Sequence, residues 1–257
     1  MQQNSLLSQA TEYLKNRLSA EISFQNNLET IIYDYAGKLV DIAYQANISP
    51  DVFTFNNKSI KEKVDALISE MEQLIITITE TLAISEREKD KVVSYMNSNV
   101  YGENFYDRLD NHVNTFKKEM EGIIAAGLLI GASRIDIKQS IKTFINMPYQ
   151  NKIFKDAVKL NKGRAEVLVS KGFHSSVGVS NSAFNSIKTL GRYTISDIWM
   201  QYWYDDWNSK GAIGYKVIRG SSYPCSICDS NVGFHTDDNL PPYHPSCCCK
   251  AIPVLDK

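Results

Sequence analysis

The chain has 257 residues, of which 43% are hydrophobic and 11% aromatic, enough apolar material to bury a core and to exclude a disordered polypeptide. The formal net charge of -1 argues against a uniformly basic nucleic-acid coat protein. The longest apolar run, residues 123–130, is much shorter than the roughly 20 residues of a membrane-spanning helix. The polar N-terminus is not typical of a signal peptide, so we expect neither a membrane span nor a secretory leader.

Helical periodicity dominates the first half of the chain. Between about residue 5 and residue 46, apolar residues recur at three- and four-residue steps, which predicts one long helix. Ser49 followed by Pro50 predicts the start of a short helix or turn. Residues 59–62 read Ser-Ile-Lys-Glu, the pattern of a capping box, and they precede the clearest apolar stripe of the protein, which extends to Leu82.

Further helices are predicted in the segments that follow. Residues 85–88 repeat the capping-box pattern and open a helix through Met96, and another helix runs from Phe105 to Ile123. Gly127 and Gly131 either end that helix or let another helix approach closely. The first 200 residues contain only Pro50 and Pro148 as prolines and no Asn-Gly or Asp-Gly hairpin signal. We therefore expect a helical bundle, more commonly antiparallel within one subunit than a coiled coil between subunits.

The charges are segregated along the chain. Residues 1–133 hold 12 Lys or Arg against 19 Asp or Glu, whereas residues 134–171 hold nine against three. Within this basic stretch we expect one short helix that ends before Pro148 and another that begins near Asn151. Its candidates for contact with nucleic acid or an acidic partner are Lys138, Lys142, Lys152, Lys155, Lys159, Lys162 and Arg164. A solvated helix face explains the same charges.

The three tryptophans lie close together, at Trp199, Trp203 and Trp207. A base-stacking platform would interleave basic residues with these rings, but the segment carries aspartates instead, so we expect it to pack a helical bundle against a C-terminal module. Residues 213–219 alternate like a strand, and residues 250–254 could pair with them in a small two-stranded element.

All five cysteines lie between positions 225 and 249. An odd number of cysteines confined to one end is unlike a disulfide framework and fits thiolates held by a metal. A Cys-x2-Cys pair followed some fifteen residues later by a second group of His and Cys is typical of a closed, structural zinc site. The candidate ligands are Cys225, Cys228, His244, Cys247 and Cys249.

Several alternatives remain open within this cluster. In an extended segment Cys247 and Cys249 face the same side, while Cys248 points away. His244 is then either the fourth ligand in place of a cysteine or a hydrogen-bond donor behind the ligands. His235 is a weaker ligand candidate. The alternative without a metal makes the cysteines small buried apolar residues.

Two kinds of enzyme use metal sites built from residues of these types. A zinc deaminase shares the Pro-Cys-x2-Cys element, but it needs an upstream His-x-Glu or Cys-x-Glu tripeptide, which the chain does not contain. A metal-assisted nuclease or toxin-like enzyme would use His244 beside the zinc site, with Asp237 and Asp238 binding a second cation. The residue types are present, but they form no ordered catalytic motif.

The C-terminal third resembles the phage Mu F-type minor head proteins, also called head morphogenesis proteins. The matching elements are Arg164-Ala165-Glu166, the tryptophan segment, the strand from Gly214 to Arg219, Cys225-x2-Cys228, Gly233-Phe234, Asp237-Asp238, Leu240-Pro241-Pro242, His244-Pro245-x-Cys247-x-Cys249 and Pro253-Val254. The resemblance implies a non-catalytic protein of the virion, located in the capsid interior or at the portal vertex and in the host cytoplasm during assembly. Its implied partners are the portal protein, the major capsid protein and, non-specifically, packaged DNA.

Together these patterns predict a mainly α protein, a helical bundle with a small α+β module stapled by structural zinc at its C-terminus. We expect three regions: an acidic helical bundle over residues 1–133, a basic and aromatic helical region over 134–210 and a zinc-binding module over 211–257. Amphipathic helices can also bury their apolar stripes between subunits, so an oligomer is compatible with the sequence.

Overall fold

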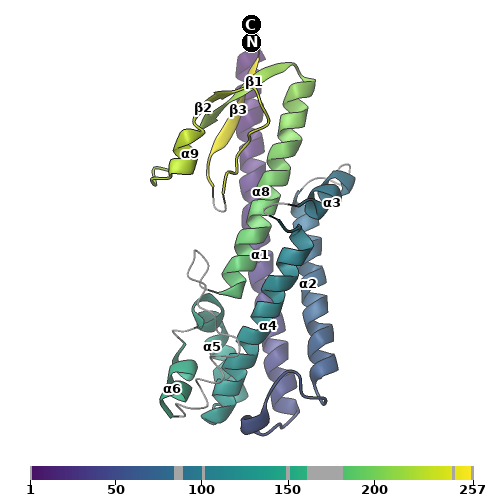
Figure 1. Ribbon diagram of the computed structural model, residues 1–257, viewed down its shortest axis with the longest axis vertical. Helices are drawn as coiled ribbons and strands as arrows, with labels where there is room; N and C mark the ends of the chain where they lie inside the picture. Colours follow the sequence, from purple (N-terminus) through teal and green to yellow (C-terminus); the bar gives the residue numbers. More distant parts are fainter. Residues whose placement is uncertain are drawn as a thin grey trace. The chain divides into compact units, whose positions relative to one another are not determined.

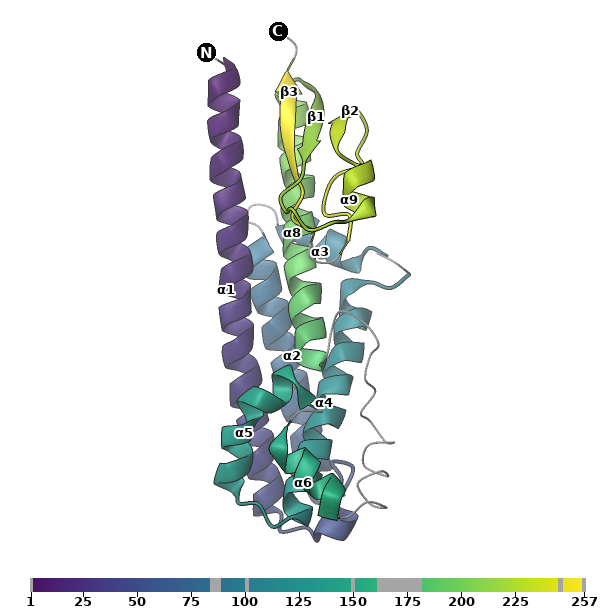
Figure 2. The same cartoon turned by 90° about the vertical axis from the view of Figure 1, so that its left-hand side faces the viewer.

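The computed structural model describes residues 2–83, 89–99, 102–148, 151–160, 182–244 and 247–255. Over these residues the chain is mainly helical, with a three-stranded antiparallel sheet near the C-terminus (Figures 1 and 2). This confirms the predicted fold class at that level. None of the helices in the described ranges has the length and apolarity needed to cross a membrane.

Most of the helices and strands occur where the periodicity predicts them. The helices are α1 Gln2–Gln45, the 3-10 helix η1 Pro50–Val52, α2 Lys61–Ala83, α3 Lys89–Asn97, α4 Phe105–Leu129, α5 Arg134–Asn146, α6 Lys152–Leu160, α8 Ala183–Ser209 and α9 Ser226–Ser230. The strands are β1 Ala212–Ile218, β2 Gly233–His235 and β3 Lys250–Leu255.

The chain forms two compact units, each assembled from separate stretches of sequence. Unit 1 contains Met1–Asn26, Ile78–Asn99 and Thr189–Lys257, and unit 2 contains Asn27–Thr77 and Val100–Lys188. Because α1, α2 and α8 each contribute residues to both units, the same helices that build the bundle also enter the unit that holds the cysteines.

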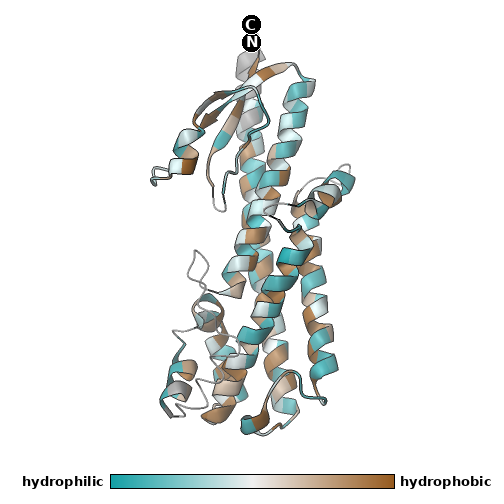
Figure 3. Cartoon of the chain, in the orientation of Figure 1, coloured by the Kyte–Doolittle hydropathy of each residue, from teal (hydrophilic) through white to brown (hydrophobic). Residues whose placement is uncertain are grey.

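The core of unit 2 is built from the apolar stripes of its helices. Along α2, the side chains of Val64, Ile68, Met71 and Ile75 are buried, as the stripe predicts, and Figure 3 shows hydrophobic residues recurring along this helix. Leu74, which belongs to the predicted stripe, is instead 39% exposed. It lies one position from Ile75, about 100° around the helix, and so falls at the edge of the buried stripe.

The caps of the helices differ from the predicted ones in detail. The Ser59 hydroxyl donates to the Asn57 side chain at 2.9 Å, and α2 begins at Lys61. Pro50 is the first residue of η1, as predicted, although the Ser49 side chain caps nothing. The second predicted capping box, residues 85–88, lies outside the described residues. A capping box that was not predicted joins Ser133 to Asp136 at the start of α5.

Both predicted roles of the glycines after Ile123 are found. Gly127 is buried in α4, and a Cβ atom there would overlap the Ile137 side chain of α5, so glycine allows the two helices to approach closely. Gly131 has a φ of +70°, the left-handed conformation that glycine adopts at helix C-termini, and α4 ends just before it. The helices on either side of Pro148 are also confirmed.

Glu119 is a buried carboxyl group of α4, with only 6% of its surface exposed. One carboxylate oxygen accepts a hydrogen bond from the backbone N–H of Ala183, the first residue of α8, at 3.0 Å. Burial raises the pKa of Glu119 to about 7, because the loss of hydration outweighs the hydrogen bond that favours the charged form.

We expect the Glu119→Gln variant to have a flatter dependence of stability on pH. The folded-state pKa lies above the value of 4.5 for an unperturbed glutamate, so the free energy of unfolding decreases as pH rises from about 4.5 to about 7. For the wild type this term is on the order of 2–3 kcal/mol. Urea unfolding at pH 5 and pH 8 measures it, with Glu62→Gln as the exposed control. Burial also raises the pKa of Asp197 to about 7, so the stability of Glu119→Gln should still decrease as pH rises, but less than that of the wild type.

Unit 1 contains the sheet, whose strand order is β2-β1-β3. The predicted pairing of the strand at 213–219 with residues 250–254 is confirmed, with Tyr215 opposite Pro253 and Ile218 opposite Lys250. The third strand, β2, was not predicted; it places His235 opposite Tyr215 on the other side of β1.

The tryptophans pack the sheet onto α8, as predicted. Trp203 and Trp207 are buried, their ring centroids are 4.7 Å apart, and they share a hydrophobic cluster with Tyr215 and Val217 of β1. Trp199 donates its indole N–H to the Leu82 carbonyl of α2 at 3.0 Å. All of these contacts lie within unit 1, so the aromatic segment joins helices and sheet in one core.

Candidate metal centre

The cysteine-rich loops meet because of the pairing of β1 with β3. Ile218, the last residue of β1, lies opposite Lys250, the first residue of β3. The loop that leaves β1 carries Cys225 and Cys228, and the loop that enters β3 carries the second group of candidate ligands. The antiparallel pairing therefore brings both loops to the same end of the sheet.

The donor atoms converge on Cys228. Its Sγ lies 3.0 Å from Nε2 of His244 and 3.7 Å from Sγ of Cys247, and the same His244 nitrogen is 3.3 Å from Sγ of Cys225. Two groups of three potential ligands share Cys228, and within each group all ligand atoms lie within 4.8 Å of one another. One group adds Cys225 and His244, and the other adds Cys247 and Cys249. This cluster could hold a metal ion.

All five residues predicted as ligands are thus brought together. Cys228 and Cys249 are buried, with 3% and 2% of their surface exposed. Cys248 is exposed and belongs to neither donor group, as the alternation of an extended segment predicts. His244 lies among the sulfur atoms, with its Nε2 within 3.3 Å of both Cys225 and Cys228.

The first loop has the backbone arrangement that a metal-bound thiolate requires. Cys225 precedes the short helix α9, and the backbone N–H groups of Cys228 and Ile227 lower the pKa of the Cys225 thiol below its usual value. Amide groups that point at sulfur stabilise the thiolate, which is the form that binds metal.

The buried thiols of the cluster, in contrast, have raised pKa values. Burial, followed by the neighbouring cysteines, raises the pKa of Cys228, and burial likewise raises that of Cys249. Several thiolates cannot share a buried site without a cation that compensates their charge. The chemistry of the donor set therefore fits a cationic metal better than a group of free thiolates.

Arg219 and Gly220, the two residues after β1, support the cluster and were not singled out from sequence. Arg219 pairs with Asp229 of α9 and donates to the Tyr223 carbonyl, so it ties the first loop together. A Cβ atom at Gly220 would overlap the carbonyl group of Cys248, and the Gly220 N–H favours the Cys249 thiolate. Only glycine lets the two loops approach this closely.

We expect the Gly220→Ala variant to bind metal about 10- to 100-fold more weakly, the usual effect of disturbing groups that support metal ligands. The overlap is with backbone atoms, so a side-chain rotation cannot relieve it. Competition with a chromophoric chelator measures the affinity. Gly37→Ala serves as the control, because a Cβ there meets no atom within 4 Å. An unchanged affinity in Gly220→Ala would contradict this role.

His235, Asp237 and Asp238 do not join the cluster. The His235 ring stacks on Tyr215 with centroids 5.6 Å apart, and its Nε2 lies 2.9 Å from the Asn231 carbonyl oxygen. Asp237 accepts a hydrogen bond from the Tyr215 hydroxyl at 3.3 Å. Among the residues that the structure describes, none of the three belongs to a group of potential metal ligands.

Comparisons of the chain with protein-family models, curated proteins and solved structures found no match. Functional inference therefore depends on the chemistry of the residues themselves.

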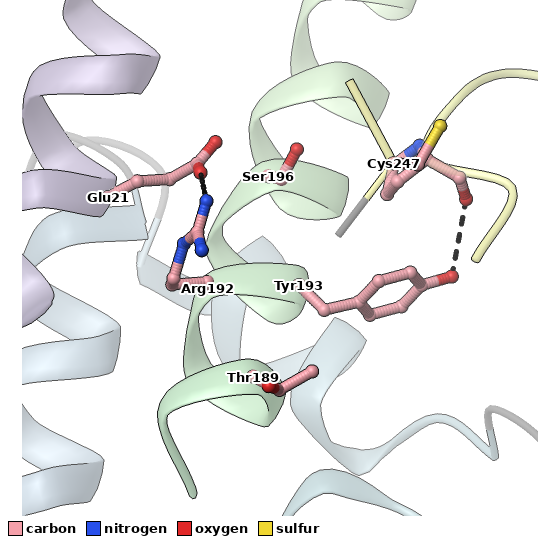
Figure 4. Close-up of a pocket in the computed structure, with 7 residues that line it drawn as sticks. Glu21, Thr189, Arg192, Tyr193, Ser196 and Cys247 are labelled. Carbon is pink, nitrogen blue, oxygen red and sulfur yellow. Dashed lines mark hydrogen bonds and ion pairs between the residues drawn. The ribbon is translucent and has the colours of Figure 1, made fainter. Parts of the chain in front are cut away.

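A small polar cavity lies beside the cluster within unit 1. Its volume is about 20 Å³, enough for about one water molecule, and its lining includes Glu21, Arg192, Tyr193 and Cys247. Figure 4 shows Arg192 pointing at Glu21, with which it forms an ion pair of 3.2 Å, while the Cys247 sulfur is turned away from that pair. Tyr193 donates to the Pro242 carbonyl at 3.3 Å, so α8 holds the second loop directly.

The predicted basic contact residues are distributed over two helices of unit 2. Lys138 of α5 forms an ion pair with Asp41 at 2.7 Å. The other described members are exposed, namely Lys142, Lys152, Lys155 and Lys159. Lys162 and Arg164 lie outside the described residues.

Proposed function

We propose that this chain is a minor head protein of a phage or prophage, that it associates with the portal or capsid, and that it has a structural zinc site and no catalytic activity. One observation carries the proposal. The Cys-x2-Cys and His-Pro-x-Cys-x-Cys elements, on which the family resemblance depends, converge around Cys228 at one end of a small sheet in a mainly helical chain.

Zinc suits this donor set best. Thiolate sulfur and imidazole nitrogen are the ligands of structural zinc sites, which bind through four protein groups. Cys225 and Cys228 would supply two ligands, and two of His244, Cys247 and Cys249 would supply the others. When bound, the metal would neutralise the thiolates and fix two loops that the short strands cannot order alone.

The number of donors supports a structural role for the site. A catalytic zinc keeps one coordination position open for water or substrate, whereas five candidate ligands here exceed the four that a closed site needs. Two of them are also part of the hydrophobic core, which restricts access of water. We therefore propose that the zinc acts through stability alone, and that head assembly, with DNA packaging or ejection, is the process the protein serves.

Metal analysis tests the site. Protein purified without chelator should contain about one zinc per chain, and a well-folded protein without metal would remove the basis for the zinc assignment. Zinc found with robust, metal-dependent cleavage of DNA or RNA would instead favour the nuclease-like alternative, and Asp237→Asn with Asp238→Asn would then abolish that cleavage.

Particle association tests the role. The chain is co-expressed with the portal and major capsid proteins of the same genome, and assembled heads are separated on a density gradient. We expect the chain to co-sediment with heads at low copy number and to require the portal or capsid protein for it. Its complete absence from purified heads would overturn the proposal, even if zinc is bound.

A further inference from the structure

A second surface, separate from the cysteine cluster, lies on unit 2 between α1 and α5. It is a hollow of about 440 Å³, lined by Tyr33 and Gly37 of α1 and by Lys138, Ile141 and Lys142 of α5. Figure 2 shows α5 beside α1, and two ion pairs join the helices at Asp41. This volume is in the range of sites that accept a ligand or an anchoring side chain.

The floor of the hollow is apolar and lacks a side chain that would fill it. Gly37 lies in the C-terminal third of α1, and a Cβ placed on it would meet no atom within 4 Å. Ile141, only 4% exposed, lies at the base, and the Tyr33 ring forms another part of the wall. An entering apolar side chain would therefore find both space and apolar contacts.

The rim of the hollow carries excess positive charge. Asp41 forms two ion pairs, with Lys138 at 2.7 Å and with Arg134 at 3.4 Å. One helical turn further along α5, Lys142 is exposed and forms no ion pair with a residue of the described ranges. Two of these basic side chains pair with Asp41, and Lys142 adds a third positive charge, against Asp41 and the Glu29 carboxylate beside Tyr33. A guest with carboxylates would complement the remaining positive charge.

We propose that this hollow docks an acidic amphipathic segment of another protein, with an apolar side chain beside Gly37 and carboxylates facing Lys142 and Lys138. A nucleic acid fits less well, since a sugar–phosphate backbone brings no apolar group to the space beside Gly37. A surface for nucleic acid would also use the exposed lysines of α6, which do not line the hollow. The inference does not depend on the proposed role in the virion.

Three variants test the site in the full-length protein. Gly37→Leu fills the hollow, and it should fold well because leucine favours helix more than glycine does and has open space here. Lys142→Glu reverses the charge at the rim. Lys155→Glu makes the same change at an exposed position of α6, outside the hollow, and is the control.

The probe is a fluorescein-labelled synthetic amphipathic helix with leucine on one face and glutamate on its flanks, and binding is followed by fluorescence anisotropy. We expect the wild type to bind it, and Gly37→Leu and Lys142→Glu each to weaken binding about tenfold, the usual loss of one anchoring contact. Lys155→Glu should stay within about twofold, and a peptide with glutamine in place of glutamate should bind more weakly.

Several results would overturn the proposal. Equal binding by the glutamine peptide, no peptide binding, or no effect of Gly37→Leu would each show that the hollow is not the site. Binding of a duplex DNA probe, weakened equally by Lys142→Glu and Lys155→Glu, would assign the surface to nucleic acid. Self-association that Gly37→Leu abolishes would assign it to a second copy of this chain.

Discussion

The Cys228→Ser variant is expected to lose its metal and to unfold the sheet and its loops, while most of the helical structure remains. Cys228 is the one donor common to both groups of potential ligands, and serine replaces its sulfur with a poor zinc ligand of similar size. Structural zinc contributes about 10–16 kcal/mol in zinc-finger peptides, as much as the total stability of many domains. A three-stranded sheet with one three-residue strand cannot offset that loss.

Three measurements follow this variant. Metal content should decrease from about one per chain to near none, and tryptophan emission should shift to longer wavelength, because Trp203 and Trp207 share a hydrophobic cluster with the sheet. Far-ultraviolet circular dichroism should retain most of its helical signal. The matched control is Cys248→Ser, which removes an exposed cysteine outside both donor groups and should change none of these properties. Helical signal lost in parallel with the metal would contradict this expectation.

The helices could be predicted because local periodicity determines them. A stripe such as Val64, Ile68, Met71 and Ile75 reflects the helix repeat itself, whatever packs against it. The pairing of β1 with β3 could also be predicted, since apolar and polar residues alternate in both segments and both adjoin the cysteine clusters. Strand β2 could not be predicted, because it has only three residues and its central Phe234 is 54% exposed.

The candidate site was predictable to the level of its donors but not of its support. Spacing alone brings Cys225 and Cys228 onto one turn, whereas the close approach at Gly220 depends on how two distant loops pack. The same limit applies to unit 2. The space beside Gly37 exists only because α5 lies against α1, and nothing in either segment alone reveals it.

Packing and metal binding are coupled in this protein, because two of the candidate ligands belong to the hydrophobic cluster. Cys228 and Cys249 share it with Trp203, Trp207, Tyr215 and Val217, and Tyr13 of α1 packs against the same cluster. The core of unit 1 is therefore completed by the residues that would bind zinc. Loss of the metal should therefore weaken the packing of the Trp203 ring, and loss of that ring should weaken metal binding.

The Trp203→Ala variant is expected to be destabilised by about 3–5 kcal/mol, the usual cost of removing a buried tryptophan. Trp203 is 4% exposed and contacts both Trp207 and Tyr13. Urea unfolding measures the loss, with Tyr223→Ala, at a side chain 79% exposed, as a control that should stay within about 0.5 kcal/mol. The apparent metal affinity of Trp203→Ala should also decrease, because metal binds the folded state.

The double variant Cys228→Ser with Trp203→Ala shows whether the stability costs of the two substitutions are coupled or simply add. If the sheet is already unfolded in Cys228→Ser, the ring of Trp203 has lost its partners in the sheet, and removing it should cost less than in the wild type. We expect the two costs to differ by about 1–3 kcal/mol, the range found for residues that share partners. Equal costs in both backgrounds would mean that Trp203 stabilises the packing of α8 on α1 alone, and that the metal site and the aromatic core are independent.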